Sequence, residues 1–373
     1  MRRAMRNRIT GVLAMVLIAA GGCSIGNVRR PPDGGSPPPG PSNSAPTSPV
    51  VEIRAADVPV TTDFNQERVD FVDANRGYAL FTRCGTDTAS SGTTPTCAAV
   101  LLATTDGGRS WQRLRHPRSE AAEQQMIVTR DGTLLLRAAP YWYRSTDGGH
   151  AFTRADGGAE PPGAFQENLS RFQFNEQWNQ IVDWRGGRAR PLPVPPVPEP
   201  TSLAYRDERL WVSGTRAGRP VVALSTDLGR TWTTPSVPAM PDGDPAGMAV
   251  EIAPDGDAWF MVRPATGRPP ALWRHPARAE GTTPWVPVAA DGLPEQADIL
   301  VPIGAGTVAV GGRSSAGVVS DGRYTVVDWP IVNRMFHSLV DGTLLAEEHE
   351  GDPLLGVGRA ADRSWIRIVL QPA

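Results

Sequence analysis

The chain has 373 residues, of which 40% are hydrophobic and 20% charged, so it contains enough apolar material for a folded core. All 37 basic residues are arginine, and four of them fall in residues 1–22, which leaves residues 23–373 with a net charge of about −6. An acidic chain of this kind argues against nucleic acid as the main partner, because binding phosphates requires a basic face. Glycine and proline make up about a fifth of the chain and favour many turns and short strands over long helices.

The N-terminus has the features of an export signal. Residues 1–8 are basic, and residues 9–22 form an apolar stretch that is too short to span a bilayer as a helix. The following string, Ala20-Gly21-Gly22-Cys23, resembles a bacterial lipobox, although Ala20 stands where leucine is usual. The resemblance implies that Cys23 is acylated and becomes the new N-terminus, which would anchor the protein on the extracytoplasmic side of the cell membrane. The alternative is an ordinary secretory signal with a cysteine there by chance.

The next segment, residues 23–50, is rich in proline, glycine and serine and has no hydrophobic period, so we expect a tether. The chain therefore divides into a signal peptide (1–22), a tether (23–50) and a folded domain (51–373). If Cys23 carries lipid, Cys84 and Cys97 are the remaining cysteines, and an exported compartment permits a disulfide between them. Two free thiols are the alternative.

The sequence of the folded domain predicts a series of β-hairpins. Apolar β-like stretches flank turn signals in residues 69–81, 127–136, 201–215, 248–262 and 336–348. Outside the signal peptide, no segment keeps an apolar period of 3.6 residues. We therefore expect an all-β fold.

One short string occurs three times: TTDGGRSW at 104–111 (box 1), STDGGHAF at 145–152 (box 2) and STDLGRTW at 225–232 (box 3). In each, Asp and Gly can form a tight turn in which the carboxylate accepts backbone N–H groups, and the aromatic residue begins the next strand. We therefore interpret the box residues as structural: Asp106, Gly108, Trp111, Asp147, Gly149, Phe152, Asp227, Gly229 and Trp232.

The boxes resemble the Asp-box, or BNR repeat, of sialidases, sortilin-type receptors and related β-propellers. This resemblance implies a propeller whose boxes lie away from the ligand face. Boxes 1 and 2 begin 41 residues apart and boxes 2 and 3 begin 80 apart, which is one and two repeats of propeller length. A degraded box is expected at 183–187, and partial boxes follow at 272–285, 318–329 and 358–365. The count predicts a single propeller of seven four-stranded blades, with six blades and an insertion at 164–195 as the alternative.

The sequence contains no assignable catalytic site, metal site or cofactor site. The five histidines lack metal-ligand spacing. Sialidases need an arginine triad, an acid aspartate and a tyrosine–glutamate pair. The first arginine of that triad is usually followed by a proline two positions later. No such proline follows Arg68, Arg76 or Arg83.

We therefore expect a membrane-anchored, non-catalytic propeller that binds an unidentified envelope protein or glycan, with a sialidase-like hydrolase as the alternative. The stretch from Gly77 to Leu114 is also similar to the propeller family of photosystem II assembly factors, which are non-enzymatic scaffolds; no photosynthetic role follows from it. The loop between Cys84 and Cys97 joins a second strand to a third, so we expect it on the face opposite the boxes, and we interpret that face as the ligand side.

Overall fold

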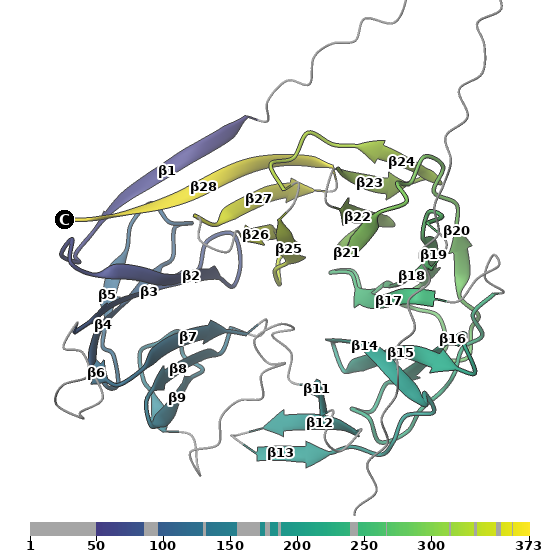
Figure 1. Ribbon diagram of the computed structural model, residues 1–373, viewed down its shortest axis with the longest axis horizontal. Helices are drawn as coiled ribbons and strands as arrows, with labels where there is room; N and C mark the ends of the chain where they lie inside the picture. Colours follow the sequence, from purple (N-terminus) through teal and green to yellow (C-terminus); the bar gives the residue numbers. More distant parts are fainter. Residues whose placement is uncertain are drawn as a thin grey trace, which may run out of the picture. The chain divides into compact units, whose positions relative to one another are not determined.

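The computed structural model describes residues 50–85, 96–129, 132–154, 172–175, 180–185, 188–238, 245–265, 267–312, 315–331, 334–347, 352–359 and 361–373, all within the unit Pro46–Ala373. Within these ranges the chain forms strands, and no helix there could cross a membrane. The strands make seven sheets that follow one another around a ring (Figure 1). The protein is thus an all-β propeller with seven blades, as the repeat spacing predicts.

The first two blades contain the disulfide and boxes 1 and 2. Blade 1 consists of β2 (Asn65–Phe71), β3 (Gly77–Cys84), β4 (Cys97–Thr104), β5 (Gln112–Leu114) and the short β6 (Glu120–Ala121), which pairs with β4. Blade 2 consists of β7 (Gln124–Val128), β8 (Leu134–Ala138), β9 (Tyr141–Ser145) and β10 (Thr153–Arg154).

The next two blades show three strands each among the described residues. Blade 3 consists of β11 (Phe172–Asn175), β12 (Gln180–Arg185) and β13 (Arg188–Pro191). Blade 4 consists of β14 (Glu199–Arg206), β15 (Arg209–Arg216) and β16 (Arg219–Ser225). In blade 4 the expected fourth strand is reduced to one bridge between Leu224 and Thr233, after which the backbone turns away and hydrogen bonds to Trp285 of blade 5 through Ser236.

The last three blades complete the ring. Blade 5 consists of β17 (Pro245–Ile252), β18 (Ala258–Pro264), β19 (Ala271–His275) and β20 (Val286–Val288). Blade 6 consists of β21 (Ala297–Gly304), β22 (Thr307–Gly312), β23 (Ala316–Ser320) and β24 (Arg323–Val326). Blade 7 consists of β25 (Met335–Ser338), β26 (Leu344–Glu347), β27 (Leu354–Arg359), β28 (Asp362–Pro372) and β1 (Val51–Val58).

The β1 strand closes the ring from the outside. It pairs in parallel with β28 over its whole length, from Val51 opposite Trp365 to Val58 opposite Pro372 (Figure 1). The first and last strands of the chain therefore share one sheet, so pairing between the two ends of the fold holds blade 7 in place.

The core lies between the blades. Each hydrophobic cluster joins residues of two neighbouring blades, and the two sides of one strand contribute to different clusters. In β26, for example, Leu344 packs toward blade 6 and Leu345 toward blade 1, because successive side chains of a strand point to opposite faces. Both faces of a blade are thus buried, which explains why strands such as β3 and β18 read as continuous apolar runs.

One of the expected repeats, the degraded box, lies in blade 3. The expected degraded box at 183–187 begins at Asp183, which lies in β12 and pairs with Phe172 and Arg190. The string spans the turn between β12 and β13, which pair antiparallel from Val182 opposite Pro191 to Arg185 opposite Arg188, and its residues 186–187 lie outside the described residues.

Candidate functional site

Box 1 forms a closed network of hydrogen bonds at the turn between β4 and β5. The Thr104 hydroxyl accepts the N–H of Gly108 at 3.0 Å and donates to Asp106 Oδ1 at 2.8 Å. The same carboxylate accepts the N–H of Ser110 at 2.9 Å and the Ser110 hydroxyl at 2.6 Å. Partial burial raises the pKa of Asp106, but the bonds from Ser110 and Thr104 outweigh it and hold the pKa at about 2.

Box 3 repeats this network with equivalent residues. Ser225 bonds the N–H of Gly229 at 2.7 Å and Asp227 Oδ1 at 2.7 Å, and Asp227 accepts both the N–H and the hydroxyl of Thr231, at 2.9 and 2.6 Å. The Thr231 hydroxyl is the largest cause that holds the pKa of Asp227 at about 2.

Box 2 has alanine where the other two boxes have a hydroxyl residue. Asp147 accepts the N–H of Ala151 at 3.0 Å and the Ser145 hydroxyl at 2.7 Å, and these two bonds lower its pKa in that order of size. The carboxylates of all three boxes are therefore engaged by their own turns. This arrangement supports the structural role predicted for them, which mutation can test.

The glycines and aromatic residues of the boxes face the core between blades. Gly149 and Gly229 have φ of +86° and +82°, and a Cβ at these positions would lie 2.6 Å from Leu114 and 2.4 Å from Leu192. Trp111 is buried with its ring edge-on to Phe71, at 6.1 Å between centroids. Phe152 packs against the cluster of blades 1 and 2, and Trp232 packs against that of blades 3 and 4.

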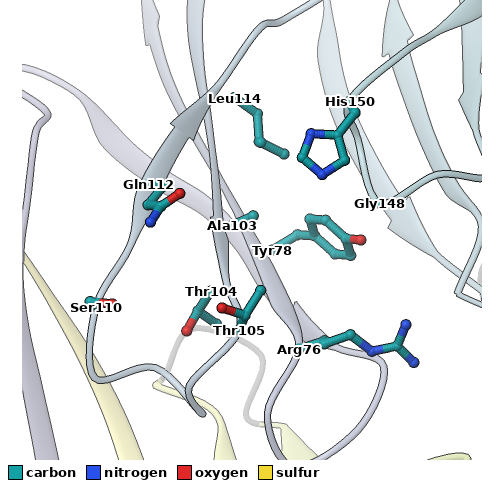
Figure 2. A pocket seen from close by; sticks show the side chains of 10 residues that line it. All are labelled: Arg76, Tyr78, Ala103, Thr104, Thr105, Ser110, Gln112, Leu114, Gly148 and His150. Carbon is teal, nitrogen blue, oxygen red and sulfur yellow. The ribbon is translucent and has the colours of Figure 1, made fainter.

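A small cavity of about 200 Å³ lies between boxes 1 and 2. Figure 2 shows the Tyr78 ring beneath His150, with Arg76 on the other side. Arg76 is engaged with Asp73, whose Oδ2 accepts a hydrogen bond from Arg76 Nε at 2.6 Å. Because the Arg76 guanidinium is already paired and most of the other lining residues are small and neutral, this cavity does not define a ligand site.

The opposite end of blade 1 carries the disulfide. Cys84 ends β3, Cys97 begins β4, and the two pair directly across the hairpin with 4.0 Å between their Cα atoms. The disulfide prediction is therefore confirmed, whereas residues 86–95 of the enclosed loop lie outside the described residues. Because Cys97 and Thr104 are the first and last residues of β4, the disulfide and box 1 lie at opposite ends of that strand. We call the end with Cys84 and Cys97 the disulfide face and the end with the boxes the box face.

Backbone pairing ties the disulfide hairpin to the connection that leads into blade 2. The β6 strand pairs Ala121 with Cys97, and the buried Gln124 side chain donates from Nε2 to the carbonyl oxygens of Cys97 and Arg118, at 3.3 and 3.2 Å. Arg118 in turn lies over the ring of Tyr141, which begins β9. The disulfide face of blades 1 and 2 is thus one connected set of contacts.

Among the carboxyl groups of the described residues, Asp70 in β2 has the most perturbed pKa. Burial raises its pKa to about 7, against the opposing effect of Arg68, which bonds both Asp70 and Glu347 at 3.2 and 3.3 Å. A raised pKa of this kind is typical of a general acid. The Asp70 side chain is only 1% exposed, however, so a substrate atom could not reach it.

Among the described residues, no cluster of three or more His, Cys, Asp or Glu side chains could hold a metal ion. Cys23, the expected lipidation site, lies outside the described residues. Sequence reasoning missed Arg118 because the arginines are spread along the whole chain and only the fold brings particular ones together.

No family model matches the chain, and no curated protein matches it. Among solved structures, it is similar to YCF48 bound to a D1 peptide, with 15% identity and a TM-score of 0.40, covering 82% of this chain and 93% of that one. A GH74 xyloglucanase from Xanthomonas campestris shows 16% identity and a TM-score of 0.39, covering 80% and 52%. Apo AztD from Citrobacter koseri shows 11% identity and a TM-score of 0.39, covering 83% and 87%. At this level of similarity, no activity, substrate or partner of those proteins transfers to this chain.

Proposed function

We propose that this protein is anchored by lipid on Cys23 at the extracytoplasmic side of the cell membrane and that its propeller is a non-catalytic binding module. Its partner is an envelope protein or a glycan. The basic and apolar stretches of residues 1–22, the small residues before Cys23 and the proline-rich segment after it support the anchor.

The contrast between the two ends of β4 carries the binding part of the proposal. At the Thr104 end, the carboxylates and hydroxyls of the boxes are engaged by their own turns. At the Cys97 end, a disulfide holds the hairpin, and Arg118 beside it makes no ion pair within the described part of the chain. A guanidinium without an internal ion pair is available to a ligand, and we therefore assign binding to the disulfide face.

A glycan hydrolase is the second candidate, and the raised pKa of Asp70 is the observation that favours it. Its burial weighs against that role. Purified protein incubated with a fluorogenic sialoside is expected to release no fluorophore above the level of an Asp70→Asn control.

Membrane fractionation tests the anchor. Wild type is expected in the membrane fraction and to incorporate a fatty-acid analogue, whereas Cys23→Ser is expected to be soluble or unprocessed. Ser24→Ala is the matched control, because it alters the neighbouring residue and keeps the cysteine. A wild type that stays unlabelled, or a Cys23→Ser variant that is labelled equally, contradicts the anchor.

A further inference from the structure

Two arginines converge on one tyrosine at the disulfide face of blades 1 and 2. The guanidinium carbon of Arg154 lies 4.7 Å from the centroid of the Tyr141 ring, and that of Arg118 lies 5.8 Å from it. Both distances are measured from the same ring centroid, so the two guanidinium carbons are at most about 10.5 Å apart. Arg118 precedes β6, Tyr141 begins β9 and Arg154 ends β10, so the three residues come from separate segments.

Neither arginine is neutralised by the described part of the protein. Arg118 Nε donates to the backbone carbonyl of Glu120 at 3.2 Å, and the Arg154 side chain makes no hydrogen bond or ion pair among the described residues. The neighbouring Glu123 bonds Arg137 at 2.9 Å instead. Two guanidiniums held near one another without a carboxylate repel each other, and a bound anion would relieve that repulsion.

Contacts with the rest of the fold fix the positions of Arg118 and Tyr141. Gln124 is buried and donates to the backbone carbonyl of Arg118 as well as to that of Cys97, so it fixes the backbone of Arg118 to the disulfide hairpin. The ring of Tyr141 gives both guanidiniums a surface to stack on, which reduces the entropy they lose on binding. Tyr141 itself is half-buried and is followed by the buried Trp142, so its position is set by the packing of blade 2.

We propose that Arg118 and Arg154 form a binding site for an extended acidic segment of a partner protein, with Tyr141 as the residue that positions both guanidiniums. This inference rests on the proposed function, because it names the chemistry of the partner at the disulfide face. Each arginine pairs with one carboxylate of the segment, in the bidentate geometry that guanidinium favours.

Two features favour an acidic peptide over a glycan. Sugars bind to propeller and other surfaces by stacking on exposed aromatic rings, but here guanidiniums lie against the ring of Tyr141. In an extended peptide, side chains two residues apart lie on the same side, about 7 Å from one another, which is below the largest separation that the two guanidiniums can have. Carboxylates at alternate positions of a strand can therefore contact both arginines at once.

The test measures fluorescence anisotropy of a labelled oligoglutamate peptide with the full-length protein in detergent. An oligoglutamine peptide and an oligogalacturonate serve as the neutral and the anionic-glycan probes. We expect saturable binding of oligoglutamate that weakens as salt is raised, and no binding of oligoglutamine. Arg118→Gln/Arg154→Gln is expected to weaken oligoglutamate binding by about tenfold or more, since that factor corresponds to the loss of two modest charge contacts.

Matched variants separate the site from general charge effects. Arg219→Gln removes an exposed arginine at the β15–β16 connection of blade 4 and is expected to bind like wild type. Tyr141→Phe keeps the ring and is expected to retain binding, whereas Tyr141→Leu is expected to weaken it by about threefold. All variants are expected to melt within a few degrees of wild type.

Three results would overturn the assignment: tighter binding of oligogalacturonate than of oligoglutamate, an equal loss of binding in Arg219→Gln, or no saturable oligoglutamate binding by folded protein. Any of them would leave the lipid anchor and the binding role of the disulfide face standing, because fractionation and crosslinking test those separately.

Discussion

Arg54 in β1 donates a hydrogen bond from Nη1 to the carbonyl oxygen of Gly107 in box 1, at 2.6 Å. Arg54 is 9% exposed, and its remaining donors bond Glu52. Since β1 pairs with β28 of blade 7 and Gly107 belongs to blade 1, this bond fastens the closing strand to the first blade. The ring is therefore closed by backbone pairing on one side of β1 and by one guanidinium on the other.

Replacing Arg54 by methionine should weaken that closure. A buried charge-assisted hydrogen bond to a carbonyl contributes about 2 kcal/mol, so Arg54→Met is expected to lower the free energy of unfolding by that amount. Chemical denaturation measures the loss. Arg323→Met, at an exposed arginine without a side-chain bond in the described residues, should be nearly neutral. Equal midpoints for Arg54→Met and wild type would show that β28 pairing alone holds β1.

The boxes should differ in their contribution to stability. Asp227 bonds both the N–H and the hydroxyl of Thr231, whereas Asp147 lacks the second of these bonds because Ala151 replaces the hydroxyl residue. Asp227→Ala is therefore expected to lower the free energy of unfolding by about 1–2 kcal/mol, and Asp147→Ala by less. Thermal melting of both variants tests this order. If Asp227→Ala melted like wild type but lost an identified ligand, the carboxylate would be functional.

Asp70 should make the protein less stable as pH rises. Its pKa is about 7 in the folded state against 3.8 when unperturbed, so between these values the folded protein holds a proton that the unfolded chain releases. The stabilisation is complete below pH 3.8 and is lost as pH rises through 7, by about 3 kcal/mol between pH 5 and pH 8.

Unfolding free energies of wild type and Asp70→Asn across this range isolate the effect, because the other titrating groups are common to both proteins. Asparagine keeps one acceptor oxygen, which can replace Oδ1 of Asp70 as the acceptor of the Phe71 N–H at 2.8 Å, and it loses the acceptor Oδ2 that faces Arg68. We expect the wild-type curve to fall more steeply with pH. Parallel curves would mean that Asp70 is ionised in the folded protein throughout.

The disulfide should stabilise the fold and shape the face that binds. Cys84 and Cys97 are 13 residues apart, and closing a loop of this size contributes roughly 3 kcal/mol in the chain-entropy model. Cys84→Ser/Cys97→Ser is therefore expected to melt at a lower temperature than wild type without reductant. With reductant, the two should melt alike. If wild type is insensitive to reductant, the bond contributes little to stability.

The sequence was most informative where one short segment determines the structure. Each box contains its own turn, so three copies at regular spacing predicted the propeller and its seven blades before any contact between blades was known. The disulfide followed from the number of cysteines and the expected compartment. These features depend on residues that are neighbours in the chain, and therefore they can be recognised from a single sequence.

Features that depend on distant contacts could not be predicted in this way. The sequence of β1, VEIRAADV (51–58), has no feature that distinguishes an outer strand paired in parallel with β28 from any other strand. The hydrogen bond from Arg54 to Gly107 joins residues that are 53 positions apart. The arrangement of Arg118 and Arg154 around Tyr141 also depends on three separate segments. Aromatic residues 141–143 were recognisable as a patch, but the position of the arginines required the fold.

Photocrosslinking in intact cells shows directly whether the disulfide face binds a partner. A photoreactive residue at Ser119, exposed beside the disulfide hairpin, is compared with one at Thr226, exposed in box 3 on the box face. We expect a discrete crosslinked adduct from Ser119 and none from Thr226. An adduct from Thr226 with none from Ser119 would contradict it, because the binding face would then be the one that carries the boxes.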